Sequence, residues 1–158
     1  MDSDCLVKLT KAGIKESIVS AMEVHIPPLV KKETVDEAKG RGFQDAVEIE
    51  GNIARRRLHV ANPHKKKIAL VSASKGEEEV VSLFEEGNYD AIASDDRRFL
   101  KILDAARIPY LTPSACLVYM HKNNRSEKKK AMEMLESLKP FISSDEYVVT
   151  KLYLEGRS

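Results

Sequence analysis

Carboxylates gather in four short segments of this 158-residue chain, each placed where a strand is expected to end or a helix to begin. The segments are Asp2-Ser3-Asp4, Glu33, Gly76-Glu77-Glu78-Glu79 and Ser94-Asp95-Asp96. Each lies beside an apolar run that has to pack, so folding is expected to bring the acids together. Carboxylates held close together repel each other unless a cation joins them. The pattern therefore predicts an acidic metal site.

Such a site suits a hard divalent cation. Mg²⁺ and Mn²⁺ take oxygen ligands and keep several of their waters. A cation of this kind orients and acidifies a water for in-line attack on a phosphodiester, and it neutralises the charge that develops. No nucleophilic side chain is then needed, and the serines lack both a nearby histidine base and a GxSxG motif.

The composition favours one cytoplasmic domain. Hydrophobic residues make up 42% of the chain, enough for one core, and residues 1–158 show no break in composition that would divide them. The formal net charge of +1 predicts neither a nucleic-acid binder nor an acidic substrate, and only local clustering of charge could indicate one. Cys5 and Cys116 lack the spacing of a zinc site, which fits a reducing compartment. The apolar runs are too short for a membrane span, and the start does not read as a signal peptide.

Strands and helices are expected to alternate along most of the chain. Apolar spacing predicts short helices over residues 5–19, a strand at 24–26, a helix from Pro27-Pro28 to Gly40 and a helix from Phe43 to Ile53. Further on, it predicts strands at 58–60, 89–94 and 108–111, with helices at 79–86, at 97–106 and from Thr112-Pro113. Residues 68–71 are apolar but fit either type. Past Lys122, residues 123–158 are expected to form a helical C-terminal tail.

This alternation is a βαβ pattern, which favours an α/β domain with a central, mostly parallel sheet flanked by helices in three layers. In open parallel sheets the functional site lies at the carboxyl ends of the strands. Asp2 and Asp95 are expected at those ends. Almost nothing precedes Asp2 in the sequence, so the first strand is expected to be truncated, or to be formed by residues outside this sequence, with Asp2 near a fraying end.

Four motifs in order resemble those of PIN-domain nucleases. Asp2-Ser3-Asp4-Cys5-Leu6-Val7 resembles their opening motif, and Pro27-Pro28-Leu29-Val30-Lys31-Lys32-Glu33 resembles their Pro-x-x-Val-x-x-Glu helix. Gly76-Glu77-Glu78-Glu79 is similar to the Gly-Glu-x-Glu helix start of one subgroup, and Ala91-Ile92-Ala93-Ser94-Asp95-Asp96 resembles the strand-end aspartate that follows it. The resemblance covers about Met1 to Met120.

The resemblance implies a Mg²⁺- or Mn²⁺-dependent endoribonuclease. On the matched motifs, its acidic quartet is carried over to Asp2, Glu33, Glu77 and Asp95, as catalytic residues and metal ligands. The family includes toxins held inactive by a small antitoxin protein and enzymes of RNA processing, and the sequence does not choose between them. The resemblance also favours a homodimer.

The other acids have simpler interpretations. Asp4 is expected to cap the first helix, Asp96 to cap the helix from Arg97, and Glu78 and Glu79 to complement their own helix dipole. Glu37, one turn beyond Glu33, is the reserve ligand, although a solvated acid is the favoured interpretation. Arg97 and Arg98 are placed to reach a phosphate or to pair with the acids. The clusters Arg55-Arg56-Arg57, Lys65-Lys66-Lys67 and Lys128-Lys129-Lys130 are expected to be solvated, although together they would attract phosphates.

Two other functions stay open. The first is a non-catalytic RNA-binding or protein-interaction module that keeps the fold, and convergence of the four acids is the feature that separates it from an enzyme. The second is a receiver-like phosphoacceptor, because Asp95-Asp96 ends a strand and acidic clusters bind Mg²⁺ there too. The absence of a mid-chain strand-end aspartate followed by a Lys-Pro strand end argues against the receiver-like interpretation.

Overall fold

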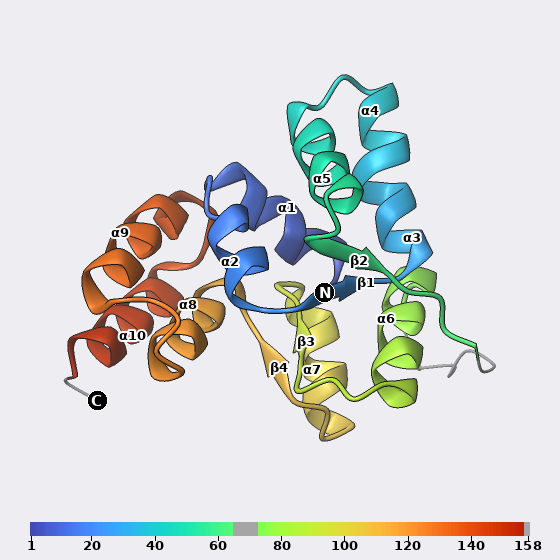
Figure 1. Cartoon of the computed structure of the whole chain (residues 1–158). Coiled ribbons are helices and arrows are strands. Elements are labelled where there is room, and N and C mark those ends of the chain that lie inside the picture. Colours follow the sequence, from blue (N-terminus) through green and yellow to red (C-terminus); the bar gives the residue numbers. More distant parts are fainter. Residues whose placement is uncertain (65–72, 157–158) are drawn as a thin grey trace.

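The computed structural model describes residues 1–64 and 73–156, and its order of helices and short strands is that of an α/β protein (Figure 1). The first half contains α1 (Ser3–Lys11), α2 (Lys15–Ala21), β1 (Val24–Ile26), α3 (Pro28–Lys31), a π-helical turn (Lys32–Glu37), α4 (Ala38–Gly40), α5 (Gln44–Ala54) and β2 (Leu58–Val60). The second half contains α6 (Lys75–Glu86), β3 (Ile92–Ala93), α7 (Arg97–Ala105), β4 (Tyr110–Leu111), α8 (Pro113–Lys122), α9 (Lys128–Leu138), a 3-10 turn (Lys139–Phe141) and α10 (Ser144–Glu155).

The described strands are parallel, as predicted, but they form two separate pairs rather than one sheet. β1 pairs with β2, with Val24 opposite Leu58, and β3 pairs with β4, with Ile92 opposite Tyr110. The strands predicted at 24–26 and 58–60 are confirmed, whereas those predicted at 89–94 and 108–111 shorten to two residues each. The apolar run 68–71 and the lysines 65–67 lie outside the described residues.

Capping residues fix where the helices begin. The prediction that Asp4 caps α1 is wrong: Asp2 is the N-cap, and its Oδ1 accepts a hydrogen bond from the Cys5 amide at 2.9 Å. Asp96 caps α7 as predicted, accepting from the amides of Arg98 and Phe99. The helix predicted to begin at residue 79 begins at Lys75 instead, because a capping box between Ser74 and Glu77 starts it earlier.

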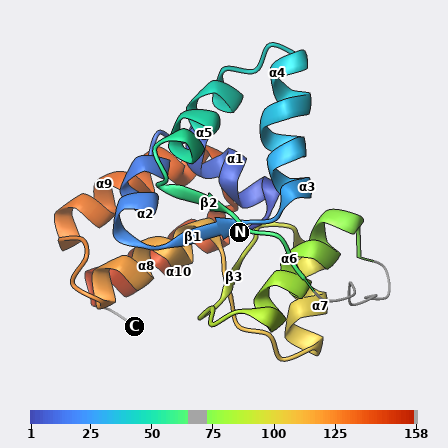
Figure 2. The same ribbon diagram turned by 45° about the vertical axis from the view of Figure 1, so that its right-hand side comes forward.

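Beyond α1 and α2, the helices form three groups around the strands. In Figures 1 and 2, the arm from α3 to α5 rises on one side, α6 and α7 lie on another, and α8, α9 and α10 pack together on a third. Apolar side chains from all parts of the chain join in one buried cluster, which includes Leu6, Ile18, Ile26, Phe99 and Leu117. The first turn of α1 lies between the two strand pairs, so its N-terminal Asp2 sits at their carboxyl ends.

Candidate active site

Asp2 is anchored between the two strand pairs rather than at a fraying end. Its amide donates to the Ala93 carbonyl at 2.9 Å, while the amine of Met1 donates to the His25 carbonyl at 2.8 Å. The Asp2 residue is only 6% exposed. Its burial raises the pKa of the carboxyl from 3.8 to about 6, although hydrogen bonds from the Ser94 hydroxyl and the Cys5 amide oppose the rise. A buried carboxyl with a raised pKa is a common feature of functional sites.

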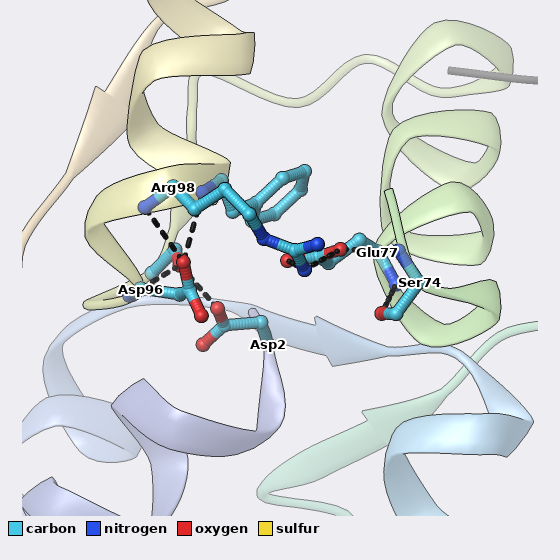
Figure 3. Close-up of polar contacts among 7 residues, drawn as sticks. Asp2, Ser74, Glu77, Asp96 and Arg98 are labelled. Carbon is cyan, nitrogen blue, oxygen red and sulfur yellow. Dashed lines mark hydrogen bonds and ion pairs between the residues drawn. The ribbon is translucent and has the colours of Figure 1, made fainter. Parts of the chain in front are cut away.

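Ser94 joins Asp2 to the start of α7. Its hydroxyl donates to Asp2 Oδ2 and accepts from the Asp96 amide at 3.2 Å, and Ser94 is fully buried. Figure 3 shows the carboxyl groups of Asp2 and Asp96 lying beside each other as a result. The two capping bonds of Asp96 both use Oδ1, at 2.7 and 2.9 Å. Sequence reasoning gave Asp96 only a capping role; the strand-end serine before it is the signal that it also lies beside Asp2.

Asp95, the predicted ligand, faces another neighbour. Its Oδ2 forms an ion pair with Lys8 Nζ from α1, and its side chain is 11% exposed. Successive residues after a strand point in different directions, so Asp95 and Asp96 cannot present their carboxyls in the same way. The sequence suggested that Arg97 or Arg98 could pair with the acids of the site. Asp95 does pair with a cation, but this cation is Lys8 of α1.

Glu77 closes the opposite side of the site from α6. It is 8% exposed, and its carboxylate accepts from the Ser74 amide as part of the capping box. Arg98 reaches from α7 and places Nη2 3.1 Å from Glu77 Oε2 and 3.3 Å from Oε1 (Figure 3). Arg98 thereby links α7 to α6 across the site, through a pair whose exposed guanidinium keeps its contribution to stability small.

Glu33 approaches from the third side, on the π-helical turn. Its Oε2 accepts from the Ser3 hydroxyl, next to Asp2, and a Cβ placed on Gly76 would lie 3.3 Å from its Oε1. Glu33 is therefore packed against the start of α6, where a glycine leaves room for it. π-Helical turns are rare in proteins, and those that occur are often found at functional sites. The turn in this protein sets the direction of Glu33.

Two other acids differ in role. Glu79 does not simply complement its own helix: it is 9% exposed, and its Oε2 accepts from the Leu29 amide at 3.0 Å, at the start of α3. Glu37, the reserve ligand, is exposed and lies 3.6 Å from Lys32 Nζ. That position matches the solvated acid favoured from the sequence.

The four predicted acids come from four different elements, and their contacts fall into separate pairs. Asp2 contacts Ser94, Glu33 contacts Ser3, Glu77 contacts Arg98, and Asp95 contacts Lys8. Within residues 1–64 and 73–156, no three His, Cys, Asp or Glu side chains are arranged to hold a metal ion.

Comparison with known families then places the chain. A family model, DUF3368, described as a PIN domain, matches residues 1–153. The chain belongs to the PIN-domain family. No curated protein and no solved structure matches it significantly.

PIN domains are generally nucleases that use divalent metals. The question for this PIN domain is whether its donor atoms are of the kind that such a cation binds. The chemistry of its donors fits, because Asp2, Glu33, Glu77 and either Asp95 or Asp96 supply only hard oxygen atoms. Their present arrangement is that of a site closed by internal cations, with Arg98 on Glu77 and Lys8 on Asp95. In the described residues, no buried side-chain polar atom lacks a hydrogen-bond partner.

Within the part of the PIN domain that is described, no helix is long and apolar enough to cross a membrane. Members of the two described basic clusters have local partners. Arg57 and Arg55 lie 3.1 and 3.9 Å from the Glu16 carboxylate, and Lys128 Nζ donates to the Glu155 carbonyl at 3.1 Å. These contacts agree with solvated, locally paired side chains.

Proposed function

We propose that this PIN domain is a divalent-metal-dependent endoribonuclease whose acidic site is built on Asp2. The observation that carries the proposal is the buried Asp2 carboxyl, held between two strand pairs and facing Asp96, with Glu33 and Glu77 approaching from two other elements. Burying a carboxylate is costly unless its charge is compensated. The raised pKa of Asp2 indicates that the compensation in the protein alone is incomplete.

The ligands that we propose are Asp2, Glu33, Glu77 and Asp95, with Asp96 as the alternative to Asp95. When bound, Mg²⁺ or Mn²⁺ would supply Lewis acidity and an activated water for phosphodiester hydrolysis. The chain itself would hold the cation against the sheet edge. Ser94 would fix the orientation of Asp2, and the π-helical turn would fix that of Glu33.

Arg98 and Lys8 would then change partners. Both now neutralise acids of the site, and Lys8 and Arg98 are 34% and 57% exposed. Because pairs this exposed contribute little to stability, about 0–1 kcal/mol, a divalent cation can displace them. Once released, either cationic group could contact a phosphate of the RNA.

The same ion pairs favour the rival function, a non-catalytic PIN-like module that binds RNA or protein. In that case Arg98 and Lys8 replace the metal permanently, and the acids serve only to hold α1, α6 and α7 together. The two functions differ in one measurable property, because only the nuclease should gain stability from a divalent cation.

Thermal melting with and without Mn²⁺ tests the metal site. A cation that binds only the folded protein at 100 times its dissociation constant stabilises it by about 2.7 kcal/mol, which for this length corresponds to a rise in Tm of about 5–10 °C. Unchanged melting curves in millimolar Mn²⁺ and Mg²⁺ would leave the non-catalytic module as the better function.

Cleavage of a labelled single-stranded RNA tests catalysis. Asp95→Asn is expected to abolish metal-dependent cleavage if Asp95 is the ligand, and Asp96→Asn is expected to do so if Asp96 is. Asn retains an acceptor oxygen for the cap but loses the charge that holds the cation. Asp4→Asn is the matched control, because it removes an exposed charge from the same helix turn as the site. Wild-type rates for both Asp95→Asn and Asp96→Asn would refute the ligand assignment.

The assembly is also part of the proposal. A homodimer and a small antitoxin partner are what the resemblance implies. Light scattering after size exclusion distinguishes a dimer from a monomer, and co-purification with the product of a neighbouring gene tests the antitoxin.

A further inference from the structure

An open groove of about 570 Å³ lies between α2 and the turn that joins α8 to α9. α2 borders it with Glu16, Ser17 and Ser20, while Arg125 of the turn and Lys130 of α9 border it as well. Hydroxyl-bearing and cationic residues therefore share one space. Among the described residues, none that lines the groove belongs to the acidic site.

The groove lies away from the acids. α2 ends at Ala21, three residues before β1 begins, whereas Asp2 sits at the carboxyl ends of the strands. Arg125 holds the turn against this end of α2, because its Nη1 donates to the Ala21 carbonyl. An arginine has several further N–H donors, so this bond leaves Arg125 able to bind a second acceptor. The groove therefore borders the amino end of β1, opposite the end at which Asp2 lies.

Three cationic side chains surround a single carboxylate, that of Glu16, at the edge of the groove. Arg57 Nη1 lies 3.1 Å from its Oε2, while Lys15 Nζ and Arg55 Nη2 lie 3.4 and 3.9 Å from its Oε1. The amide of Asn52 donates to the same Oε1 at 2.8 Å. One carboxylate balances one of these charges, so the cluster keeps an excess of positive charge. Arg55 and Arg57 carry it at the surface, with side chains that are 59% and 51% exposed.

Positive charge is concentrated in the segments around α2. Residues 15–21, 55–57 and 125–130 contain eight basic and two acidic side chains. The formal net charge of the whole chain is only +1, so the remaining residues together are negative. In Figures 1 and 2, α2 lies between α9 and the end of α5, which adjoin the other two segments. An uneven distribution of this kind attracts anions to one face even when the total charge is near zero.

The lining of the groove favours a nucleic-acid backbone over a protein partner. Docking sites for proteins are rich in aromatic anchors, and single-stranded bases stack on aromatic side chains. Among the described residues, no aromatic side chain lines the groove, and its apolar lining consists of Ala21 and Met120. Arginine, lysine and serine are instead the side chains that donate to phosphate oxygens. The groove is therefore suited to contacts with phosphates rather than with bases.

We propose that this groove binds the phosphates of single-stranded RNA at a distance from the acidic site. Arg57, Lys130 and the fork of donors on Arg125 supply the charge. The hydroxyls of Ser17 and Ser20 add neutral donors. Contacts of this kind hold and orient a strand without reading its sequence. The proposal rests on RNA as the substrate of the proposed nuclease, and it adds a second place of contact for a strand that reaches the acids.

RNA binding without cleavage tests the groove. A fluorescently labelled single-stranded RNA, long enough to span the domain, is titrated with the full chain in EDTA, and its anisotropy gives the dissociation constant between about 50 and 200 mM salt. Arg57→Gln combined with Lys130→Gln removes one charge on each side of the groove. Lys39→Gln combined with Lys101→Gln is the matched control, because it removes two charges from exposed positions of α4 and α7.

The groove variant, Arg57→Gln with Lys130→Gln, is expected to weaken binding by about tenfold at low salt. Each lost phosphate contact should also lower the slope of log affinity against log salt by about 0.7. The control should change affinity by less than about twofold. Glu16→Gln, which keeps an acceptor for the Asn52 amide, should tighten binding by about two- to fivefold, a gain that a misfolded variant would not produce.

Equal losses in the groove variant and the control, an unchanged salt slope, weaker binding by Glu16→Gln, or no binding of RNA by the wild-type chain would overturn the proposal. Tighter binding of labelled polyglutamate than of RNA would overturn it in favour of an acidic protein segment. The chelator separates this test from the nuclease. RNA binding at the groove by a chain that cleaves with no metal refutes the proposed function alone, whereas cleavage by a chain whose groove variant binds RNA normally refutes the groove alone.

Discussion

Replacing Asp2 by asparagine is expected to stabilise the metal-free protein above pH 6. The pKa of the Asp2 carboxyl rises from its ordinary 3.8 to about 6 because the group is buried. The folded protein therefore binds a proton more tightly at this position than the unfolded chain does. By linkage, the free energy of unfolding falls as pH rises from about 4 to about 6, and above that range the loss from this group is complete.

The size of the effect follows from the same shift. About two pKa units at about 1.4 kcal/mol each give about 3 kcal/mol as an upper value at pH 7. The asparagine side chain of the Asp2→Asn variant would keep the capping acceptor for the Cys5 amide and a polar partner for Ser94. The variant should therefore lack the pH-dependent loss of stability while keeping the N-terminal cap of α1.

Urea unfolding at pH 4, 5, 6 and 7 in the presence of a chelator measures the difference in stability between Asp2→Asn and wild type. At pH 7 the urea midpoint of Asp2→Asn should lie about 1–2 M above that of wild type. The difference between the two midpoints should shrink towards pH 4. Asp4→Asn is the control for the general effect of removing a negative charge near this helix end. Parallel pH profiles of wild type and Asp2→Asn would refute the link between burial and the stability of the site.

Three further results are expected. Arg98→Ala frees the Glu77 carboxylate, so the Mn²⁺ concentration at half-maximal stabilisation should fall by about two- to fivefold; an unchanged midpoint in the Mn²⁺ titration would exclude Glu77 as a ligand. Ser94→Ala removes a buried hydroxyl that contacts both Asp2 and the Asp96 amide, and urea unfolding should show a loss of about 1–3 kcal/mol; a loss near zero would mean that this network is not formed. A hydrogen bond with Cys116 and burial raise the pKa of the Cys5 thiol, so an aromatic disulfide reagent should label the two thiols only as the protein unfolds, and rapid labelling of the native protein would contradict their burial.

The sequence predicted the elements that local signals define. The strands at 24–26 and 58–60 are each followed closely by a proline that starts a helix or a turn, and the helix from Pro28 begins at a proline that is compatible with a first turn. Asp96 was recognisable as a cap because it directly precedes the helix. The same rule failed for α1, because Asp2 and Asp4 are both capping residues by type and only the position of the Cys5 amide decides between them.

Contacts between distant segments were not predictable in the same way. Arg98 and Glu77 lie on different helices, and nothing in either segment indicates that the two side chains meet. Lys8 lies beside the apolar stripe of α1, whose spacing says nothing about Asp95. The two short strands β3 and β4 also depend on a neighbour across the sheet, which local periodicity does not report. The family resemblance placed the acids in one region, but it did not specify which partners would hold them.

The π-helical turn at Lys32–Glu37 separates the placement of Glu33 from that of the arm beyond it. Glu33 is the second residue of this turn, whereas α5 packs against the turn and against α1. Each helical residue advances the chain by about 100°. Removing one residue after Glu33 would therefore leave the acid in place but rotate the arm away from its contacts. In sequence comparisons, the part of the turn after Glu33 should tolerate exchange of side chains far better than a change in length.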